Sequence, residues 1–377
     1  MKIIIHGSTF GSNFGDCLFA KMFYDFCEKK YPDSVKFYEN NSLIRKDLFT
    51  VSEHYRDYMN YQKTFSKKDL AECDCMVYMA GGYFGETTTS LKEAVIRYWR
   101  YMKFGYYAIR HKKPIAIIGV GAGPISKEFL RRKIKKIFNY ASLITVRNEE
   151  SKKYLEEIGV KNEIIVTSDV AQMVDKSFTS KLEDKTLTNI KESIGNKKII
   201  LLHCSTQIKH INIIKEKILF ELSKYAVEND YGIVLCVDQC DVSRIEELTK
   251  MADILECPFY VYNYENPSKL ISLIDFVDIV VTSKLHVGIL SCSLNKSVYS
   301  FPFNKNKIVR YYKQIGYPER CIPVGLLKNN DVYNLMKKYG EEKIILSDEI
   351  KNLSENNFKF LGEFLDRIYR KSGDKIA

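Results

Sequence analysis

The sequence predicts an α/β protein made of two Rossmann-like domains that face a cleft. Short apolar, β-branched runs alternate along the chain with segments of helical periodicity, as βαβ units require. Several of these runs end in glycine or in polar residues, which is typical of the ligand-binding edge of a parallel sheet. A polar, charged stretch near the middle of the 377 residues separates two such sets, so we expect two domains of ordinary size.

Composition limits the class of protein. Hydrophobic residues make up 45% of the chain, which is enough for two cores. No apolar run is long enough to span a bilayer and no secretory signal is evident, so we expect a cytoplasmic protein. The ten cysteines form no C-x-x-C pair, which indicates buried thiols rather than a structural zinc site. The formal net charge of +11 suits anionic substrates, anionic lipid or nucleic acid, but no nucleic-acid-binding motif accompanies it.

The first strand is expected from Lys2 to His6 and a helix from Cys17 to about Cys27. The loop between them has glycines at 7, 11 and 15, a spacing that does not match the G-x-G-x-x-G fingerprint of dinucleotide-binding proteins. Asn13 and Asp16 offer hydrogen bonds to a polar substrate. The alternative is a tight turn in which Asp16 caps the helix.

Two glycine-rich strand ends follow. The segment CDCMVYMAGGYFGE predicts a buried strand that ends in Gly81-Gly82, and a helix is expected from about Ser90 to His111. The segment PIAIIGVGAGPI predicts a strand that ends in glycines 119, 121 and 123. Glycines at successive strand ends let the backbone approach a ligand, so we expect these ends to border a shared cleft.

The segment 129–140 predicts a basic amphipathic helix, because lysines and arginines alternate there with apolar residues at helical spacing. One interpretation is peripheral contact with an anionic membrane, where a lipid-linked acceptor would reside, which would place the protein at the inner face of the membrane. The other is the solvated face of a surface helix.

Two polar strand ends complete the first domain. Arg147 follows the apolar run ASLITV, and Asp169 follows IIVTS. An arginine at this edge is suited to bidentate binding of a carboxylate or a phosphate. The alternative is a salt bridge from Arg147 to Glu149 or Glu150.

Composition also sets the domain boundaries. We expect an N-terminal domain over 1–175, a linker over 176–197, a C-terminal domain over 198–345 and a closing helix within 346–377. The second domain has five expected strands, near 198–204, 232–237, 258–262, 277–282 and 297–302.

The stretch from Val277 to Gly316 carries the strongest functional signal. An apolar strand stops at Thr282-Ser283, and an apolar helix follows to about Leu294. With Ser283 as N-cap, His286 falls at the third helical position, where backbone N–H groups lack intrahelical partners and the helix dipole favours a phosphate or a carboxylate. A bound polyanion favours the protonated imidazole, which suits a general acid. The alternative is an ordinary capping histidine.

In their order and spacing, these pieces resemble the polysaccharide pyruvyltransferase family. The matching motifs are Asn13-Phe14-Gly15-Asp16, Gly81-Gly82, GVGAGP at 119–124, Val146-Arg147-Asn148 followed by Ser151, Ser168-Asp169, Ser283-Lys284-Leu285-His286, and Lys307 ahead of the Ile-Gly at 315–316. The chain departs from the family pattern at Cys17, Tyr83, Asn148 and Lys284. Lys284 replaces an arginine, so the charge is kept and the planar fork is lost.

The resemblance implies transfer of the enolpyruvyl part of phosphoenolpyruvate to sugar hydroxyls of a surface polysaccharide or exopolysaccharide of the cell envelope, on a fold similar to the GT-B glycosyltransferase arrangement. The C-terminal domain would hold the donor and the N-terminal domain the acceptor. The implied roles are His286 as general acid, Arg147, Lys307, Lys284 and Ser283 in donor binding, and Asn13, Asp16, Gly81, Gly82 and Asp169 in acceptor binding. The expected partners are phosphoenolpyruvate and a glycan or lipid-linked oligosaccharide, without a metal, a redox cofactor or nucleic acid.

Two alternative functions stay open. A GT-B glycosyltransferase that uses a nucleotide sugar would share the cleft and the Arg/Lys pair on the phosphates. A catalytically inactive family member would serve as a glycan-binding partner, and the lysine at 284 is the residue that keeps this alternative open. Binding of phosphoenolpyruvate, of a nucleotide sugar or of an oligosaccharide alone distinguishes the three.

Overall fold

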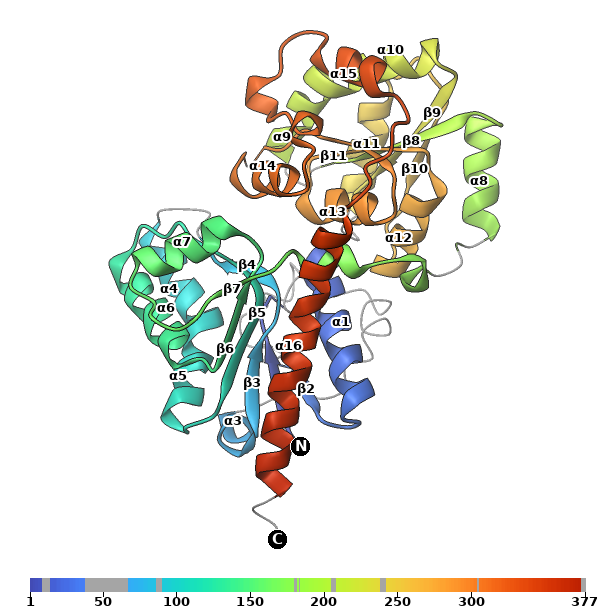
Figure 1. Ribbon diagram of the computed structural model, residues 1–377. Coiled ribbons are helices and arrows are strands. Elements are labelled where there is room, and N and C mark those ends of the chain that lie inside the picture. Colours follow the sequence, from blue (N-terminus) through green and yellow to red (C-terminus); the bar gives the residue numbers. More distant parts are fainter. Residues whose placement is uncertain are drawn as a thin grey trace. The chain divides into compact units, whose positions relative to one another are not determined.

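The chain forms two compact units in the computed structural model (Figure 1), which describes residues 1–8, 14–37, 67–85, 90–179, 182, 184–204, 208–237, 242–303 and 305–373. Unit 1 comprises Met1–Gly11, Asp16–Val170 and Glu349–Ala377. Unit 2 comprises Ser12–Gly15 and Ala171–Asp348. Each unit holds a parallel sheet, so the α/β class predicted from the sequence is confirmed.

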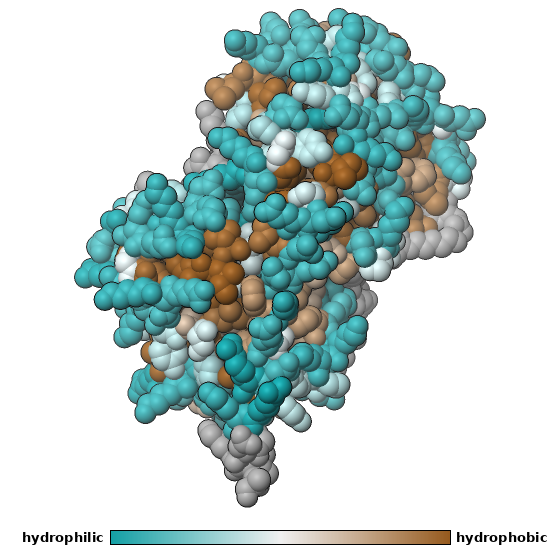
Figure 2. All heavy atoms as spheres, viewed as in Figure 1, coloured by the Kyte–Doolittle hydropathy of each residue, from teal (hydrophilic) through white to brown (hydrophobic). Residues whose placement is uncertain are grey.

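Hydrophilic side chains cover most of the face shown in Figure 2, and hydrophobic areas lie between them. None of the described helices combines the length and the apolar character needed to cross a bilayer.

The sheet of unit 1 has the strand order β2-β1-β3-β5-β6-β7, with β4 beside β5. The strands are β1 Ile3–His6, β2 Val35–Phe37, β3 Cys75–Tyr78, β4 Gly81–Phe84, β5 Ile115–Ala122, β6 Leu143–Val146 and β7 Ile165–Val166. The strand order reverses direction between β1 and β3. Loops diverge at such a switch point, which is where open α/β sheets bind ligands.

Gly81-Gly82 was predicted to end a strand, and this is wrong. The preceding strand, β3, already ends at Tyr78, and the two glycines begin the separate strand β4. Gly81 has a φ of +154°, which glycine adopts more readily than any other residue. The chain therefore breaks between β3 and β4, and both pair with β5.

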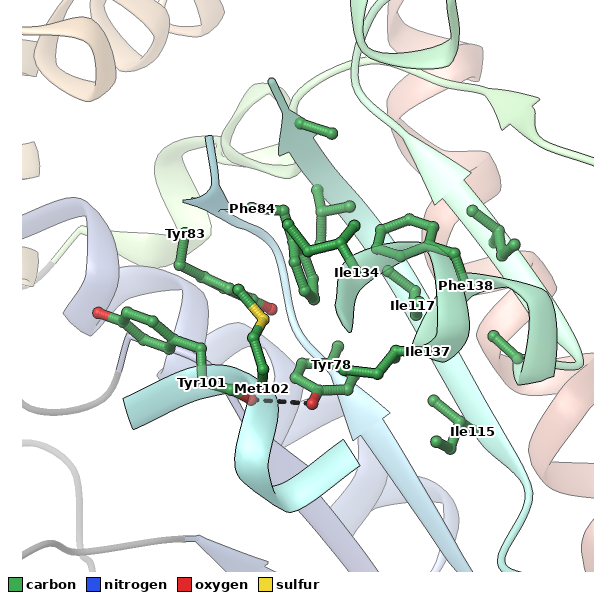
Figure 3. Close-up of a cluster of buried hydrophobic side chains, with 14 of the residues drawn as sticks. Tyr78, Tyr83, Phe84, Tyr101, Met102, Ile115, Ile117, Ile134, Ile137 and Phe138 are labelled. Atoms are coloured by element: carbon green, nitrogen blue, oxygen red, sulfur yellow. Dashed lines mark hydrogen bonds between the residues drawn. The ribbon is translucent and has the colours of Figure 1, made fainter. Parts of the chain in front are cut away.

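Apart from Phe14, Gly15 and Asp348, which unit 2 includes, the helices of unit 1 are α1 Phe14–Lys30, α3 Lys67–Glu72, α4 Leu91–Arg97, the π-helical turn η1 Tyr98–Met102, α5 Lys103–Arg110, α6 Glu128–Tyr140, α7 Glu149–Glu157 and α16 Asp348–Gly373. The helix expected from Ser90 to His111 is thus interrupted by η1. The π turn places the neighbouring residues Tyr101 and Met102 in the core (Figure 3). It also presents the Tyr101 carbonyl to the Tyr78 hydroxyl, which donates a 2.9 Å hydrogen bond.

The amphipathic helix predicted at 129–140 is confirmed as α6. Its apolar side chains Ile134, Ile137 and Phe138 are buried in the core of unit 1, where Phe138 packs edge-on against Phe84 (Figure 3). The basic side chains of α6 are half-buried or exposed.

Helix α16 lies along α1 within unit 1 (Figure 1). The ring of Phe358 is 5.0 Å from that of Phe23. One turn of α16 also reaches the sheet, because Asn357 Oδ1 accepts hydrogen bonds from Thr145 at 2.7 Å and from Thr167 at 2.9 Å. Asn357 therefore joins α16 to the ends of β6 and β7.

The sheet of unit 2 has the order β10-β9-β8-β11-β12, and all its pairings are parallel. The strands are β8 Lys198–His203, β9 Tyr231–Cys236, β10 Phe259–Tyr262, β11 Ile279–Thr282 and β12 Ser297–Ser300. The five strands predicted for the second domain are confirmed within a few residues. The direction of the strand order reverses between β8 and β11, which makes this the switch point of unit 2.

The helical elements of unit 2 are η2 Val170–Met173, η3 Lys176–Phe178, α8 Asp184–Ile194, α9 Ile208–Ile214, η4 Lys215–Leu219, α10 Phe220–Glu228, α11 Val242–Ala252, α12 Pro267–Phe276, α13 Leu285–Ser293, α14 Lys305–Gln314, η5 Pro318–Arg320, η6 Val324–Leu326 and α15 Asp331–Tyr339. The segment 176–197, expected as a linker, contains η3 and α8. Ile190 and Ile194 lie four residues apart on α8 and are buried, which explains why this charged stretch folds as a helix.

Candidate functional site

In unit 2, Thr282 ends β11 at the switch point. It is in register with His203 at the end of β8 and with Ser300 at the end of β12. The Thr282 hydroxyl lies 3.4 Å from His203 Nδ1 and accepts a 3.0 Å hydrogen bond from the backbone N–H of Lys284. Thr282 therefore connects the two strands of the switch point to the segment that begins α13.

The prediction that Ser283 caps α13 is wrong by one residue. The N-cap is Lys284, with extended backbone angles of φ −111° and ψ 139°, so His286 is the second helical residue. Because Thr282 Oγ1 takes the Lys284 N–H, the chain stays extended through Lys284. His286 still lies in the first turn, where backbone N–H groups have no acceptor within the helix. The Ser283 Oγ atom is buried and makes no hydrogen bond to any residue that the structure describes.

The imidazole of His286 lies against Gly15, which belongs to unit 2. A Cβ atom on residue 15 would stand 1.7 Å from His286 Nδ1 and 2.3 Å from its Cγ, so only glycine fits there. Sequence reasoning placed Gly15 in a family motif but did not connect it to the histidine. No sequence pattern predicts this contact, because the two residues are far apart in the chain.

Lys307 is the third residue of α14, which follows β12, the neighbour of β11. The structure therefore brings Ser283, Lys284, His286 and Lys307 to the same edge of the unit 2 sheet. His203 lies at this edge too, and sequence reasoning missed it. The available signal was its position close to the end of the strand expected near 198–204.

In unit 1, Arg147 follows β6 and forms an ion pair with Asp169. The Arg147 Nη1 atom is 3.1 Å from Asp169 Oδ2, and both side chains are buried. The guanidinium lies on Gly121, where a Cβ atom would come within 2.7 Å of Arg147 Nε. The glycine at the end of β5 therefore leaves room for the arginine.

Asn148 is the N-cap of α7. Its Oδ1 atom accepts hydrogen bonds from the backbone N–H of Ser151 at 3.0 Å and from the Ser151 hydroxyl at 2.7 Å. The Ser151 hydroxyl in turn accepts a 3.0 Å bond from the Ala122 N–H. The amide oxygen of Asn148 thus caps α7, a role for which asparagine and aspartate are about equally suited.

The residues expected to bind the acceptor do not form one cluster. Asp16 and Gly81 follow the switch-point strands β1 and β3, whereas Asp169 follows β7, which β5 and β6 separate from β3. Asp16 lies inside the first turn of α1 and accepts a 2.8 Å bond from the Ser8 hydroxyl, so the alternative in which it is the N-cap of this helix is not what the structure shows. Gly82 stands beside Gly81 in β4. Asn13 lies outside the described residues.

His6, at the end of β1, is a structural histidine. It is fully buried among the rings of Tyr78, Tyr101 and Phe104, and its Nε2 atom is 3.2 Å from the Tyr101 carbonyl oxygen. Burial lowers its pKa from 6.5 to about 3. The imidazole is therefore neutral near neutral pH and donates its Nε2 proton to the carbonyl, which can only accept.

Residues 13–304 match a family model described as polysaccharide pyruvyl transferase. A comparison with curated protein sequences gave no match.

Solved structures of low sequence identity share the fold. MnaA of S. aureus, in a co-structure with UDP, is 14% identical with a TM-score of 0.64 over 97% of both chains. The UDP-GlcNAc 2-epimerase of Neisseria meningitidis bound to UDP-GlcNAc is 14% identical with a TM-score of 0.60 over 96% of this chain and 100% of the other. MurG of Acinetobacter baumannii is 9% identical with a TM-score of 0.54 over 97% and 99%. The fold is therefore the two-domain GT-B-like α/β fold, as predicted.

Proposed function

Because the chain belongs to the polysaccharide pyruvyl transferase family, we propose that it transfers the pyruvyl group of phosphoenolpyruvate to hydroxyls of a surface polysaccharide or exopolysaccharide. The observation that carries this proposal is the position of His286 in the first turn of α13, after the strand that borders the switch point of unit 2. The start of a helix favours anions, and phosphoenolpyruvate carries a phosphate and a carboxylate on three carbons.

The donor would be held by groups at this edge. The buried hydroxyl of Ser283 offers a hydrogen bond to a donor oxygen, and Lys284 and Lys307 supply positive charge from the N-cap of α13 and the first turn of α14. A lysine at 284 neutralises an anion as a point charge, without the bidentate geometry of arginine. We propose Arg147 as a further donor-binding residue, since a guanidinium has five N–H donors and can bind more than one carboxylate.

The proposed reaction begins with proton transfer from the His286 imidazolium to the methylene carbon of phosphoenolpyruvate, which leaves an oxocarbenium-like centre at the neighbouring carbon. One sugar hydroxyl adds to that carbon and loses its proton. Phosphate then leaves with the electron pair of its C–O bond, and a second hydroxyl adds to close a cyclic ketal. The net products are the ketal and inorganic phosphate. The protons lost by the two hydroxyls balance the one given to the methylene and the one taken up by the leaving phosphate.

A second candidate is glycosyl transfer from a nucleotide sugar. It is supported by the likeness of the fold to solved structures that contain UDP or UDP-GlcNAc. Such a donor also carries phosphates that the start of α13 could bind.

A thermal-shift titration separates the two candidates, because a ligand that binds only the folded state raises the free energy of unfolding by about 2.7 kcal/mol at a hundredfold excess over its dissociation constant. We expect phosphoenolpyruvate to raise the melting temperature more than inorganic phosphate or pyruvate at equal concentration. A shift with UDP-GlcNAc and none with phosphoenolpyruvate would favour glycosyl transfer. Phosphate release in the presence of a diol-containing oligosaccharide then tests the reaction itself.

A further inference from the structure

Four large hydrophobic side chains are exposed within nine residues of unit 1. The exposed fractions are 62% for Leu91, 42% for Val95, 39% for Ile96 and 52% for Trp99. Leu91, Val95 and Trp99 follow one another at intervals of four residues and so share one side of the helix formed by α4 and η1. Single exposed hydrophobic residues are ordinary, but a cluster of this kind indicates an interaction surface.

The opposite side of the same helix is fixed in the core. Ala94, Tyr101 and Met102 are buried, and the Tyr101 carbonyl accepts the hydrogen bond from Tyr78 that Figure 3 shows. The exposed residues are therefore presented by an anchored helix.

Positive charge surrounds the exposed residues. Lys103 Nζ lies 4.7 Å from the centre of the Trp99 ring. The Tyr98 ring is 5.8 Å from that of Trp99, and Lys133 Nζ from α6 lies 5.6 Å from Tyr98 and 4.5 Å from Tyr106. The basic side of α6 thus continues the surface that begins at Trp99.

A basic pocket extends this surface. Its volume is about 420 Å³, and it is lined by Ile109, Arg132, Lys135, Lys136, Asn139 and Tyr140. Lys136 connects the pocket to the rest of the surface, because its Nζ atom lies 5.2 Å from the Tyr106 ring. Three cationic side chains around one hollow suit a phosphate group.

We propose that this face of unit 1, which we call the α4–α6 face, docks on an anionic phospholipid bilayer. Leu91, Val95 and Trp99 would enter the interfacial region, while the lysines and arginines of α5 and α6 bind lipid phosphates. Residues 90–113 contain seven lysines and arginines and one acidic residue, and residues 128–140 contain five and one. This excess of one sign, next to tryptophan and tyrosine, is complementary to a negatively charged lipid surface and not to a mixed-charge protein surface.

The sequence alone suggested membrane contact through helix 129–140. The proposal goes further, because the exposed side chains of α4 and η1 would insert into the bilayer while the basic side chains of α6 bind lipid phosphates. It is also independent of the reaction proposed for unit 2.

Trp99 makes the proposal directly measurable, because it is the only tryptophan of the chain. On mixing the full-length protein with vesicles of phosphatidylglycerol and phosphatidylcholine, we expect its emission to shift to shorter wavelength and the protein to sediment with the vesicles. Vesicles of phosphatidylcholine alone should bind less, and added sodium chloride should weaken binding to the anionic vesicles. Inorganic phosphate at matched ionic strength should not release the protein, which separates a lipid surface from a free phosphate as the ligand.

Variants identify the two parts of the face. Leu91→Glu with Val95→Glu should lower vesicle affinity at least tenfold. Lys133→Glu with Lys136→Glu should do the same, since each basic residue near an anionic surface changes affinity on the order of fivefold. Phe220→Glu and Lys337→Glu are the matched controls: Phe220 is an exposed hydrophobic residue of unit 2, and Lys337 Nζ lies 5.8 Å from a tyrosine ring there. Both controls should bind vesicles like the unaltered protein.

The proposal is overturned if the protein neither sediments with anionic vesicles nor shifts its emission, or if both double variants bind like the unaltered protein. Sedimentation velocity provides a further check. A dimer that Leu91→Glu with Val95→Glu dissociates would assign the face to a second copy of the chain instead of a membrane. Thermal unfolding confirms that each variant is folded, as expected for changes outside the buried core.

Discussion

Arg147 and Asp169 form a buried ion pair in unit 1, with 3.1 Å between Nη1 and Oδ2 and side-chain exposures of 8% and 4%. The pair joins the residue after β6 to a residue after β7. Removal of one of two paired buried charges lowers the free energy of unfolding, because the other charge is left desolvated and without a counter-charge.

Asp169→Asn should therefore lower the free energy of unfolding by about 3 kcal/mol. Urea denaturation measures the change. The double variant Arg147→Met with Asp169→Leu should recover most of the loss, because it removes both charges together. Equal stability of Asp169→Asn and the unaltered protein would show that the pair contributes little.

The same double variant tests the proposed role of Arg147 in donor binding. If Arg147 binds phosphoenolpyruvate, a folded Arg147→Met with Asp169→Leu protein should bind the donor at least about tenfold more weakly, which is the scale of one charge-assisted hydrogen bond. Isothermal titration calorimetry gives the affinity. An unchanged dissociation constant would leave the arginine with a structural role only.

His286→Gln should lower the turnover number by about 10² to 10⁴-fold, the usual contribution of a general acid, while leaving the affinity for phosphoenolpyruvate within a few fold. Phosphate release measures turnover, and calorimetry measures binding. His111→Gln, at an exposed position of unit 1, is the control and should keep full activity. Full activity of the His286 variant would remove the assignment of the acid.

Gly15→Ala should impair turnover through His286, because the added methyl group would overlap the imidazole ring. We expect a loss of at least about tenfold, as small displacements of a catalytic group cost rate steeply. The control is Gly325→Ala, since nothing lies within 4 Å of a Cβ atom there. If Gly15→Ala and Gly325→Ala were equally active, the contact would not position the histidine.

His6 should make the stability of the protein depend on pH below neutrality. Its pKa is 6.5 when unfolded and about 3 when folded, so the unfolded chain binds the proton first as the pH falls. The stabilisation is complete above pH 6.5 and declines by about 1.4 kcal/mol per pH unit as the pH falls toward 3. His6→Gln should flatten this part of the curve of unfolding free energy against pH.

The elements with clear periodicity could be predicted from the sequence, and the contacts between distant residues could not. A local sequence pattern is enough to predict the buried strands β8 and β11 and the amphipathic helix α6. The N-cap of α13 was misplaced by one residue because a side-chain hydrogen bond from Thr282, and not the preference of serine, decides where the helix begins. The π turn at Tyr98–Met102 presents the Tyr101 carbonyl to the distant Tyr78 hydroxyl, a contact that no local pattern contains.

In the candidate site too, local patterns predict some features, whereas contacts between distant residues could not be predicted. Strand ends and the Ser283-Lys284-Leu285-His286 motif point to the edge of the unit 2 sheet, since parallel strands present their carboxyl ends together. The contact of Gly15 with His286 and the pairing of Arg147 with Asp169 arise only when segments far apart in the chain meet.

The return of α16 to unit 1 has a consequence for the order of events during synthesis. Thr145 and Thr167 emerge from the ribosome long before Asn357, whose side chain accepts their hydrogen bonds and donates to the Ser168 carbonyl. The sheet of unit 2 is encoded entirely between these points and can pair its strands first. The half of the protein that is translated earlier is thus the half that is completed last.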